Sequence, residues 1–506
     1  MNFLDRLERY FVRFEWRIVT GLVALLALRL WISPLSSSLW VDETATWWAS
    51  GGSFTDWVNA MKTTQFPQSP LYTLFMWMVA QVTGFHEVLL RLPSVAAMTA
   101  AAAMLYRVGR TLFGPMPGIY SLLLWISLGN VSFAAADARP YGIALFAVIC
   151  SAYSFIRWLQ TGKLYLVIGN GVALTVAIHC NYYFGAILLA QVTFVLFAHL
   201  QGWLRLRPVM LFSPLLTGIM LLPVLAIVPH VAREAGIHVV SGMPSWTDLG
   251  MTWMPPRWIV AAALATGAIA MIRPAKISFA ATMLEPSAPL SRMATLYWLA
   301  LLAVTPPLLL FLFSHLGKTP AFLPRYYLSM TPGLSLLGAY AVSCLQPSLW
   351  RWAFALTLFG MSMLPGGARL WTSHHQTEDW RTASAIVRAI REKDPTTMVL
   401  AGTSFTESRF LPAPVDAVQK RWLLTPQIAY PVPGPLELLP IEVTPSNESD
   451  FRSVINRAAE RDHFVVWVPA TSPTAPWIMG RFSEQYQSTV LHPEPLVVRF
   501  DRRAGK

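Results

Sequence analysis

Two adjacent carboxylates, Asp42 and Glu43, follow the first long apolar segment of the chain, residues 16–32. Ionised side chains beside the hydrocarbon of a membrane are energetically costly, and where they occur they usually mark a site or a pathway. A carboxylate held there could accept the proton of a hydroxyl group. The pair therefore predicts a site for acid-base chemistry at a membrane surface.

Cationic side chains recur in other loops that are predicted to lie on the same side. Fixed cations stabilise the charge that grows on a leaving phosphate oxygen, and arginine can bind phosphate in a bidentate manner. Together these residue types favour a reaction in which a hydroxyl loses its proton while a phosphate leaves. The candidates for contact with a phosphate or a sugar are Lys62, Arg91, Asp137, Arg139, Tyr141, Lys318 and Arg325.

Each candidate also has a purely structural interpretation. Asp42 could cap an interfacial helix, and Glu43 could simply favour the positive end of that helix. Asp137 and Arg139 could pair only with each other, as many surface ion pairs do. The remaining cations could anchor helix ends among the lipid headgroups.

The composition places this chemistry in a membrane protein. Of the 506 residues, 55% are hydrophobic and only 13% are charged. Several apolar runs are long enough to cross ~30 Å of hydrocarbon. Much of the basic charge behind the formal net charge of +12 lies in short loops between these runs, as cytoplasmic loops require, so no nucleic-acid partner is expected.

Hydropathy and loop charge predict an α-helical polytopic protein with about eleven transmembrane helices. The arginines of residues 1–17 place the N-terminus in the cytoplasm, so the carboxylate pair faces the outside. The apolar run at 71–82 is short, and we predict that it is interfacial or re-entrant. The predicted spans are residues 16–32, 91–106, 116–135, 140–158, 163–179, 184–200, 208–229, 257–273, 294–314, 325–343 and 350–365.

The outer loop, residues 34–70, carries the carboxylates and is predicted to contain interfacial helices. Phe54, Trp57, Val58 and Met61 recur at helical spacing and form one apolar stripe. Such a helix lies in the plane of the membrane surface. We therefore expect short helices over residues 42–62.

From about residue 365 the composition becomes that of a soluble domain. Residues 378–393 predict an amphipathic helix with Ala385, Ile386 and Ile390 on one face, and residues 398–401, 464–468 and 496–500 are short β-rich runs. We expect a transmembrane domain over 1–365 and an extracytoplasmic (periplasmic) α/β domain over 366–506, which is large enough to bury its own core.

Six short motifs occur in order within roughly residues 16–345: Val41-Asp42-Glu43-Thr44, Gln68-Ser69-Pro70-Leu71-Tyr72, Arg91-Leu92-Pro93-Ser94, Asp137-Ala138-Arg139-Pro140-Tyr141, His179-Cys180-Asn181-Tyr182-Tyr183 and Arg325-Tyr326-Tyr327. In this order they resemble the GT-C glycosyltransferases related to protein mannosyltransferases. The resemblance is greatest to the bacterial branch that includes aminoarabinose and galacturonosyl transferases of lipopolysaccharide. The C-terminal domain is matched by position alone.

The resemblance implies a GT-C fold, a polyprenyl-phosphate sugar as donor and inversion at the anomeric carbon. It implies Asp42 as general base with Glu43 as its partner, and donor contacts from Arg91, Arg139 and Arg325. The segment Gln68-Ser69-Pro70 lacks the His or Lys that the family often has there, which leaves open how that part of the phosphate is held. Some GT-C enzymes use a divalent metal and others do not. The sequence shows no clear set of metal ligands, so it does not call for a cofactor, and a divalent metal stays possible.

Two functions fit these features. The first is a glycosyltransferase of the bacterial inner membrane that acts on an acceptor hydroxyl of a cell-envelope glycan, lipid or protein at the outer face. The alternative is a transporter or flippase of lipid-linked sugars, which should carry its polar features near the bilayer midplane. The candidate residues cluster at one face, which favours the transferase. A non-catalytic scaffold would explain the C-terminal domain but not the loops.

Overall fold

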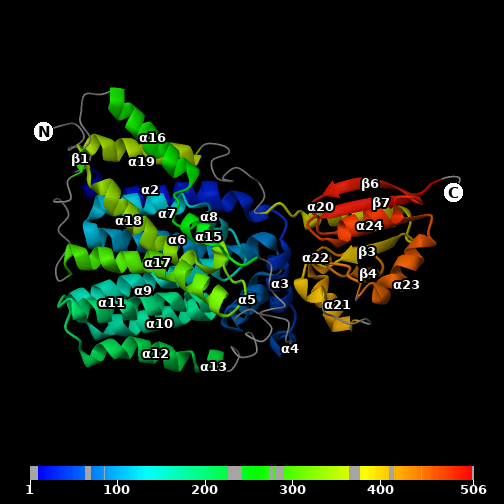
Figure 1. Ribbon diagram of the computed structural model, residues 1–506, viewed down its shortest axis with the longest axis horizontal. Helices are drawn as coiled ribbons and strands as arrows, with labels where there is room; N and C mark the ends of the chain where they lie inside the picture. Colours follow the sequence, from blue (N-terminus) through cyan, green and yellow to red (C-terminus); the bar gives the residue numbers. More distant parts are fainter. Residues whose placement is uncertain are drawn as a thin grey trace.

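The computed structural model describes residues 10–62, 70–84, 86–225, 242–272, 278–279, 290–363, 376–409, 415, 417–445 and 447–503. These residues form a bundle of helices and, beyond one end of the bundle, a smaller unit built on a β-sheet (Figure 1). The fold is that of a mostly helical membrane protein with a small C-terminal sheet.

Each of the eleven predicted spans contains at least one helix. Five helical segments are long and apolar enough to cross a membrane, and the pair α7 and α8, bent by 78°, adds a sixth if it forms one span; this count covers the described residues only. The helices of the bundle are α2 (Glu15–Ala27), α6 (Glu87–Phe113), α7 (Pro115–Ile126), α8 (Gly129–Ala135), α9 (Tyr141–Thr161), α10 (Leu164–Cys180), α11 (Ala186–Leu200), α12 (Phe212–Met220), α13 (Leu222–Leu225), α15 (Trp246–Met251), α16 (Arg257–Ile272), α17 (Arg292–Leu316), α18 (Thr331–Ser343) and α19 (Ser348–Met363).

Close helix packing in the bundle depends on small residues. Helices α6 and α7 approach at Gly109 and Gly118, where a Cβ atom added to Gly109 would lie 2.9 Å from the Gly118 Cα. Small residues allow membrane helices to approach closely, since lipid provides no hydrophobic force between them. Two short strands, β1 (Ser278–Phe279) and β2 (Leu345–Gln346), pair antiparallel beside the bundle.

A buried polar network joins four helices within the bundle. Ser151 of α9 donates to Asn170 Oδ1 of α10 at 2.6 Å, and Asn170 Nδ2 donates to Gln191 of α11 and Ser213 of α12, each at 2.9 Å. Gln191 Nε2 donates in turn to Ser151. Because hydrocarbon offers no alternative partners, such a closed network stabilises one arrangement of the helices.

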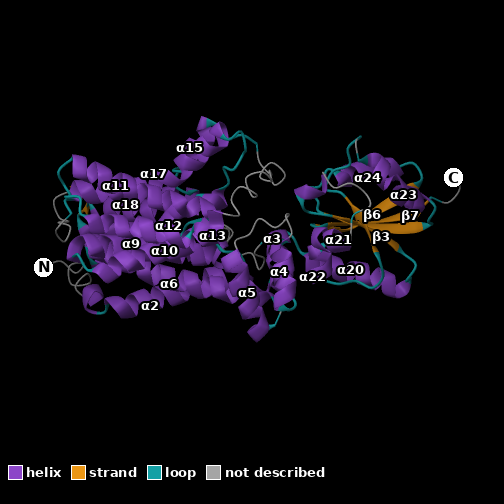
Figure 2. Ribbon diagram, turned by 90° about the horizontal axis from the view of Figure 1, so that it is seen from below, coloured by secondary structure: helices purple, strands orange, loops and turns teal. Residues whose placement is uncertain are grey.

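The predicted interfacial segment forms three helices at one end of the bundle: α3 (Val41–Ser50), α4 (Phe54–Lys62) and α5 (Pro70–Thr83). Figure 2 shows them at the end of the bundle that faces the sheet. The expectation of short helices over residues 42–62 is confirmed. Helix α5 has 14 residues and is not among the candidate spans.

The C-terminal unit is a five-stranded sheet in the order β4-β3-β5-β7-β6, covered by helices on both faces. Its first three strands are parallel, and β7 and β6 are added antiparallel. The elements are α20 (Trp380–Lys393), β3 (Met398–Gly402), α21 (Ala417–Leu423), α22 (Thr425–Ala429), β4 (Leu436–Leu439), α23 (Glu448–Ala459), β5 (His463–Val468), α24 (Thr474–Phe482), β6 (Tyr486–Pro493) and β7 (Leu496–Arg502).

Helix α20 and strands β3, β5 and β7 were predicted, and the buried face of α20 was predicted in part. Ala385 is exposed, and the face against the sheet carries Trp380, Ala383, Val387 and the buried Arg391. Ile386 and Ile390 are half-buried and pack against the same cluster, so the prediction was wrong for Ala385 only. The Arg391 guanidinium lies inside, where main-chain carbonyl oxygens, including that of Thr397, accept its hydrogen bonds.

Candidate active site

The site lies in the loop between α2 and α3. A π-helical turn (Leu28–Ile32) and a 3-10 turn (Ser33–Ser36) carry the chain out of the first span, and α3 begins at Val41. Asp42 and Glu43 are thus in the first turn of α3. Carboxylates are stabilised there by the partial positive charge of the helix N-terminus.

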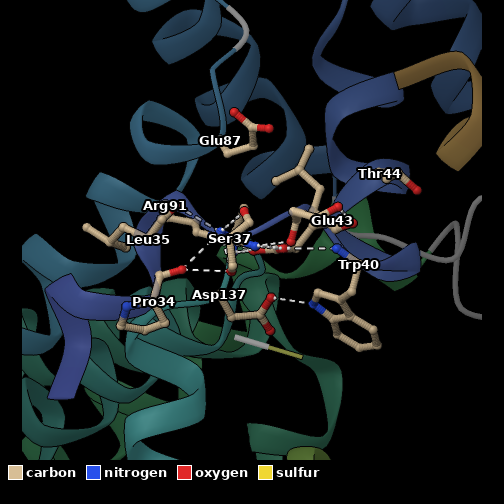
Figure 3. Close-up of polar contacts among 12 residues, drawn as sticks. Pro34, Leu35, Ser37, Trp40, Glu43, Thr44, Glu87, Arg91 and Asp137 are labelled. Atoms are coloured by element: carbon tan, nitrogen blue, oxygen red, sulfur yellow. Dashed lines mark hydrogen bonds and ion pairs between the residues drawn. The ribbon is translucent and has the colours of Figure 1, made fainter. Parts of the chain in front are cut away.

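Glu43 is fully buried and pairs with Arg91 of α6 (Figure 3). Arg91 Nε donates to Glu43 Oε1 at 2.7 Å, and Arg91 Nη2 contacts the other carboxylate oxygen. A buried ion pair is stable only when its remaining hydrogen-bonding groups are also satisfied. Main-chain carbonyl oxygens of the outer loop complete the set around Arg91: Leu35 at 2.9 Å, Ser37 at 2.7 Å and Ser38 at 2.9 Å.

The Asp137 motif lies against the same buried pair. The Ala138 amide donates to Glu43 Oε1 at 2.8 Å, and Trp40 Nε1 donates to Asp137 Oδ1 at 3.0 Å (Figure 3). The Asp137 carbonyl oxygen accepts a bond of 2.6 Å from Ser94 of α6. Asp137 is buried, and through the bond with Trp40 its carboxylate stabilises the loop that precedes α3.

Asp42 has different partners. Its Oδ2 atom lies 2.9 Å from Arg325 Nη1 and 3.9 Å from Arg139 Nη2, and its carbonyl oxygen accepts a bond of 3.1 Å from Arg139 Nη1. The Asp42 side chain is 23% exposed, whereas Glu43 is 0% exposed. The structure thus brings together one accessible carboxylate and two arginines from motifs about 100 and 280 residues further along the chain.

Aromatic side chains border this cluster. Tyr141, two residues after Arg139 at the start of α9, is buried. The Arg325 guanidinium lies 5.4 Å from the ring centre of Tyr326, which is within range of a cation–π interaction. This ring adds a contact to the Arg325 guanidinium group beside Asp42.

Of the two candidate lysines, the structure describes the side chain of Lys318 only. Lys62 ends α4, and its side chain lies outside what the structure describes. Lys318 is exposed in the loop after α17, where its φ angle of 52° is left-handed. Residues Gln68 and Ser69 of the second motif also lie outside the described ranges.

Sequence analysis did not find the residues of the C-terminal unit that contact the same loop. Glu378 Oε2 accepts a bond of 3.0 Å from the Val41 amide, and the Tyr430 hydroxyl accepts one of 2.8 Å from the Leu39 amide. Burial raises the pKa of Glu378 to about 7 and that of Tyr430 to about 12. From the sequence, Glu378 was predicted only to lie at the start of a helix. No local pattern indicates that its side chain contacts Val41, 337 residues away.

Among the residues that the structure describes, no three His, Cys, Asp or Glu side chains gather in a way that could hold a metal ion. The cationic groups next to Asp42 are both arginines. These guanidinium groups are suited to binding the oxygen atoms of a phosphate.

The chain has three parts: a bundle of apolar helices, interfacial helices that carry Asp42 at one end of the bundle, and an α/β unit beyond them. This arrangement is the fold of the GT-C membrane glycosyltransferases. Residues 67–227 match the family model described as dolichyl-phosphate-mannose-protein mannosyltransferase. The matched stretch includes the second, third, fourth and fifth motifs in full. No curated protein matches the chain in sequence.

Two solved structures of ArnT from Cupriavidus metallidurans share this fold over almost the whole chain. The apo structure is 14% identical, covers 97% of this chain and 98% of its own, and has a TM-score of 0.57. The structure bound to undecaprenyl phosphate is also 14% identical, covers 97% and 99%, and has a TM-score of 0.55. The family match over residues 67–227 and the fold shared with the ArnT structures both agree with the motifs: the chain has the fold of the GT-C glycosyltransferases, and part of it is similar to the protein mannosyltransferase family.

Proposed function

We propose that this enzyme transfers one sugar from a polyprenyl-phosphate donor to an acceptor hydroxyl at the outer face of a bacterial inner membrane, with Asp42 as the general base. The observation that carries this proposal is the cluster of Asp42 with Arg139 and Arg325. A proton acceptor and two phosphate-binding groups lie within one small, partly exposed site. The bound undecaprenyl phosphate of the ArnT structure supports the choice of donor class.

In the proposed reaction the acceptor oxygen attacks the anomeric carbon from the face opposite the phosphate. The bond between the anomeric carbon and the phosphate oxygen breaks, and its electron pair leaves with the lipid phosphate. The acceptor proton passes to Asp42, and the configuration at the anomeric carbon is inverted. Arg139 and Arg325 stabilise the leaving charge, which counts for more in a partly dry site than in water.

Because Asp42 is paired with Arg139 and Arg325, binding of the donor phosphate would also change the environment of Asp42. In the structure, the two guanidinium groups face Asp42. A donor phosphate would compete for both of them, because phosphate oxygens are strong bidentate acceptors for arginine. Binding of the donor would then weaken the pairing of Asp42 and free its carboxylate for the acceptor proton.

Glu43, Arg91 and Asp137 are assigned a supporting role instead of direct contact with substrate. The Glu43–Arg91 pair is 0% exposed on both sides, so neither group can reach a donor without local rearrangement. Asp137 is buried with them. Their place in this proposal is to fix the loop from which Asp42 projects.

The proposed orientation keeps the N-terminus in the cytoplasm and the C-terminal domain, residues 366–506, outside. Helix α9 starts beside Asp42 and has 21 residues, so its other end lies about 30 Å away. The basic residues Arg157 and Lys163 are found at that other end, as the positive-inside rule requires. The acceptor would be a cell-envelope glycan, lipid or protein.

Sugar transfer in isolated membranes tests this function. Membranes that contain the wild type, Asp42→Asn or Arg139→Ala are given a panel of radiolabelled polyprenyl-phosphate sugars. We expect the wild type to incorporate one of the sugars and Asp42→Asn to lose this activity while it still inserts normally. Undiminished transfer by Asp42→Asn would contradict the assignment of the base. Movement of labelled lipid between leaflets with no donor consumed would favour the transporter.

A further inference from the structure

The C-terminal unit forms hydrogen bonds with four residues of the outer loop, Ser36, Ser38, Leu39 and Val41. Arg381 Nη2 donates to the Ser36 carbonyl at 2.9 Å, and the Arg381 amide donates to Ser38 Oγ at 3.2 Å. The remaining two contacts are those of Leu39 with Tyr430 and of Val41 with Glu378. Four of the six residues from 36 to 41 are therefore bonded to a domain more than 330 residues away in the sequence.

The contact of Glu378 falls at the start of the helix that carries Asp42. Val41 is the first residue of α3, and its amide is one of those that have no partner within the helix. Glu378 Oε2 accepts this amide at 3.0 Å and also accepts Trp380 Nε1 at 2.7 Å. The Trp380 side chain is fully buried, so the carboxyl group has a fixed position.

We infer that Glu378 is a positioning residue for sugar transfer: it caps the first turn of α3 and so fixes Asp42 against Arg139 and Arg325. This role rests on the proposed function, in which Asp42 accepts the acceptor proton. Glu378 itself does not touch the reacting atoms. The C-terminal domain thereby contributes to the transfer step and not only to the binding of an acceptor.

The packing around α3 shows why such a cap matters. On one side, Glu43 ties the first turn to Arg91 of the bundle. On the other, Ala45 and Ala49 pack against Trp422 and neighbouring residues of the C-terminal unit. The helix has only 10 residues, and helices this short depend on external contacts to hold their ends. Loss of the Glu378 contact leaves the Val41 amide without its partner and frees the first turn on that side.

The charged groups around Glu378 are unfavourable to its ionised form. Asp42 and Glu494 both repel a negative charge on Glu378, while the Val41 amide and the Trp380 indole donate hydrogen bonds to it. A single oxygen atom accepts both bonds. A glutamine can therefore keep both contacts through its carbonyl oxygen while it removes the charge.

The test compares four variants of the full-length enzyme in detergent or nanodiscs. Glu378→Ala removes the cap, and Glu378→Gln keeps the acceptor oxygen. Glu437→Ala is the matched control, because Glu437 lies in the same domain and pairs at 3.2 Å with Arg457, away from the outer loop. Asp42→Asn reports on the proposed base. Turnover and the KM for the donor are measured from pH 6 to 8, and hydrogen exchange is followed in a peptide covering residues 39–45.

We expect Glu378→Ala to lower turnover on the order of tenfold, as expected for loss of a helix cap that holds a catalytic group, with little change in the KM for the donor. Amide exchange in residues 39–45 should become faster in this variant and not in Glu437→Ala. Glu378→Gln should restore turnover and exchange protection and show a flatter pH dependence than the wild type.

Three results would overturn the inference: normal exchange in Glu378→Ala, equal turnover in Glu378→Ala and Glu437→Ala, or an unchanged pH profile in Glu378→Gln. Hydrogen exchange does not depend on the reaction, so it tests the cap even if the donor is misassigned. Active Asp42→Asn would instead contradict the proposed function. If Glu378→Ala does not fold, Glu378→Gln still tests the cap, because faster exchange in residues 39–45 of that variant would contradict it.

Discussion

Asp42 and Glu43 are neighbours in sequence, yet their carboxylates lie in different surroundings. Asp42 is partly exposed beside Arg325 at 2.9 Å, and Glu43 is fully buried against Arg91. Adjacent residues of a helix point about 100° apart, and this difference in direction separates a group that substrate can reach from a group that supports it. The two residues should respond differently to the same kind of substitution.

Replacement of Asp42 by Asn should lower the turnover number by about 10²–10⁴-fold, which is the usual contribution of a general base. Binding of the donor should be unchanged or tighter, because Arg139 and Arg325 lose a competing carboxylate. Single-turnover kinetics with labelled donor, together with an equilibrium binding measurement, separates the two effects. A parallel loss of turnover and donor binding would indicate a structural role for Asp42.

Replacement of Arg91 by Ala should destabilise the protein by about 3–5 kcal/mol, the usual effect of leaving one member of a buried ion pair without its partner. Thermal unfolding of the purified protein measures this effect. The double variant Glu43→Gln with Arg91→Ala should lose less than the sum of the two single variants, because no uncompensated charge then remains. Additive losses would show that the pair is not coupled.

Replacement of Arg325 by Lys should raise the KM for the donor about tenfold while the protein folds normally. Lysine keeps the positive charge but cannot form the bidentate contact of a guanidinium group with phosphate. Steady-state kinetics at several donor concentrations provides the measurement. Lys318→Ala is a suitable control, since Lys318 is exposed, and its kinetics should match the wild type within about twofold.

The contact between Glu378 and α3 should make stability depend on pH. Burial raises the pKa of Glu378 to about 7, above the value of an exposed glutamate. A carboxyl whose pKa is raised by folding stabilises the protein when it is protonated, and this stabilisation is lost as the pH rises through about 7. The unfolding temperature should fall between pH 6 and 8 in the wild type, and the fall should be smaller in Glu378→Gln.

The sequence was sufficient for the features that depend on local pattern. Long apolar runs predicted the membrane helices, and the stripe of Phe54, Trp57, Val58 and Met61 predicted α4. The grouping of Asp42 with Arg139 and Arg325 followed from loop charge and motif order, because all three were expected at the same face. Strands β4 and β6 were missed.

The partners of individual side chains could not be predicted. Arg91 was expected to contact the donor and Glu43 to assist Asp42 as its catalytic partner. No local pattern shows that these two charged groups, 48 residues apart in sequence, form a buried ion pair. The same holds for Glu378, whose partner lies 337 residues away. Arg391 was missed because an arginine on a helix is usually taken as exposed, and here main-chain carbonyl oxygens satisfy it.

The contacts of Glu378 and Tyr430 with the outer loop also set the order in which the enzyme can mature. The loop is synthesised with the first membrane helix, whereas Glu378, Arg381 and Tyr430 leave the ribosome after all the described bundle helices. Domains tend to fold in the order of synthesis. The outer loop is therefore inserted at the membrane before these contacts can form. A nascent or truncated chain that lacks the C-terminal domain would insert its helices, but the segment that carries Asp42 would lack the contacts with Glu378, Arg381 and Tyr430.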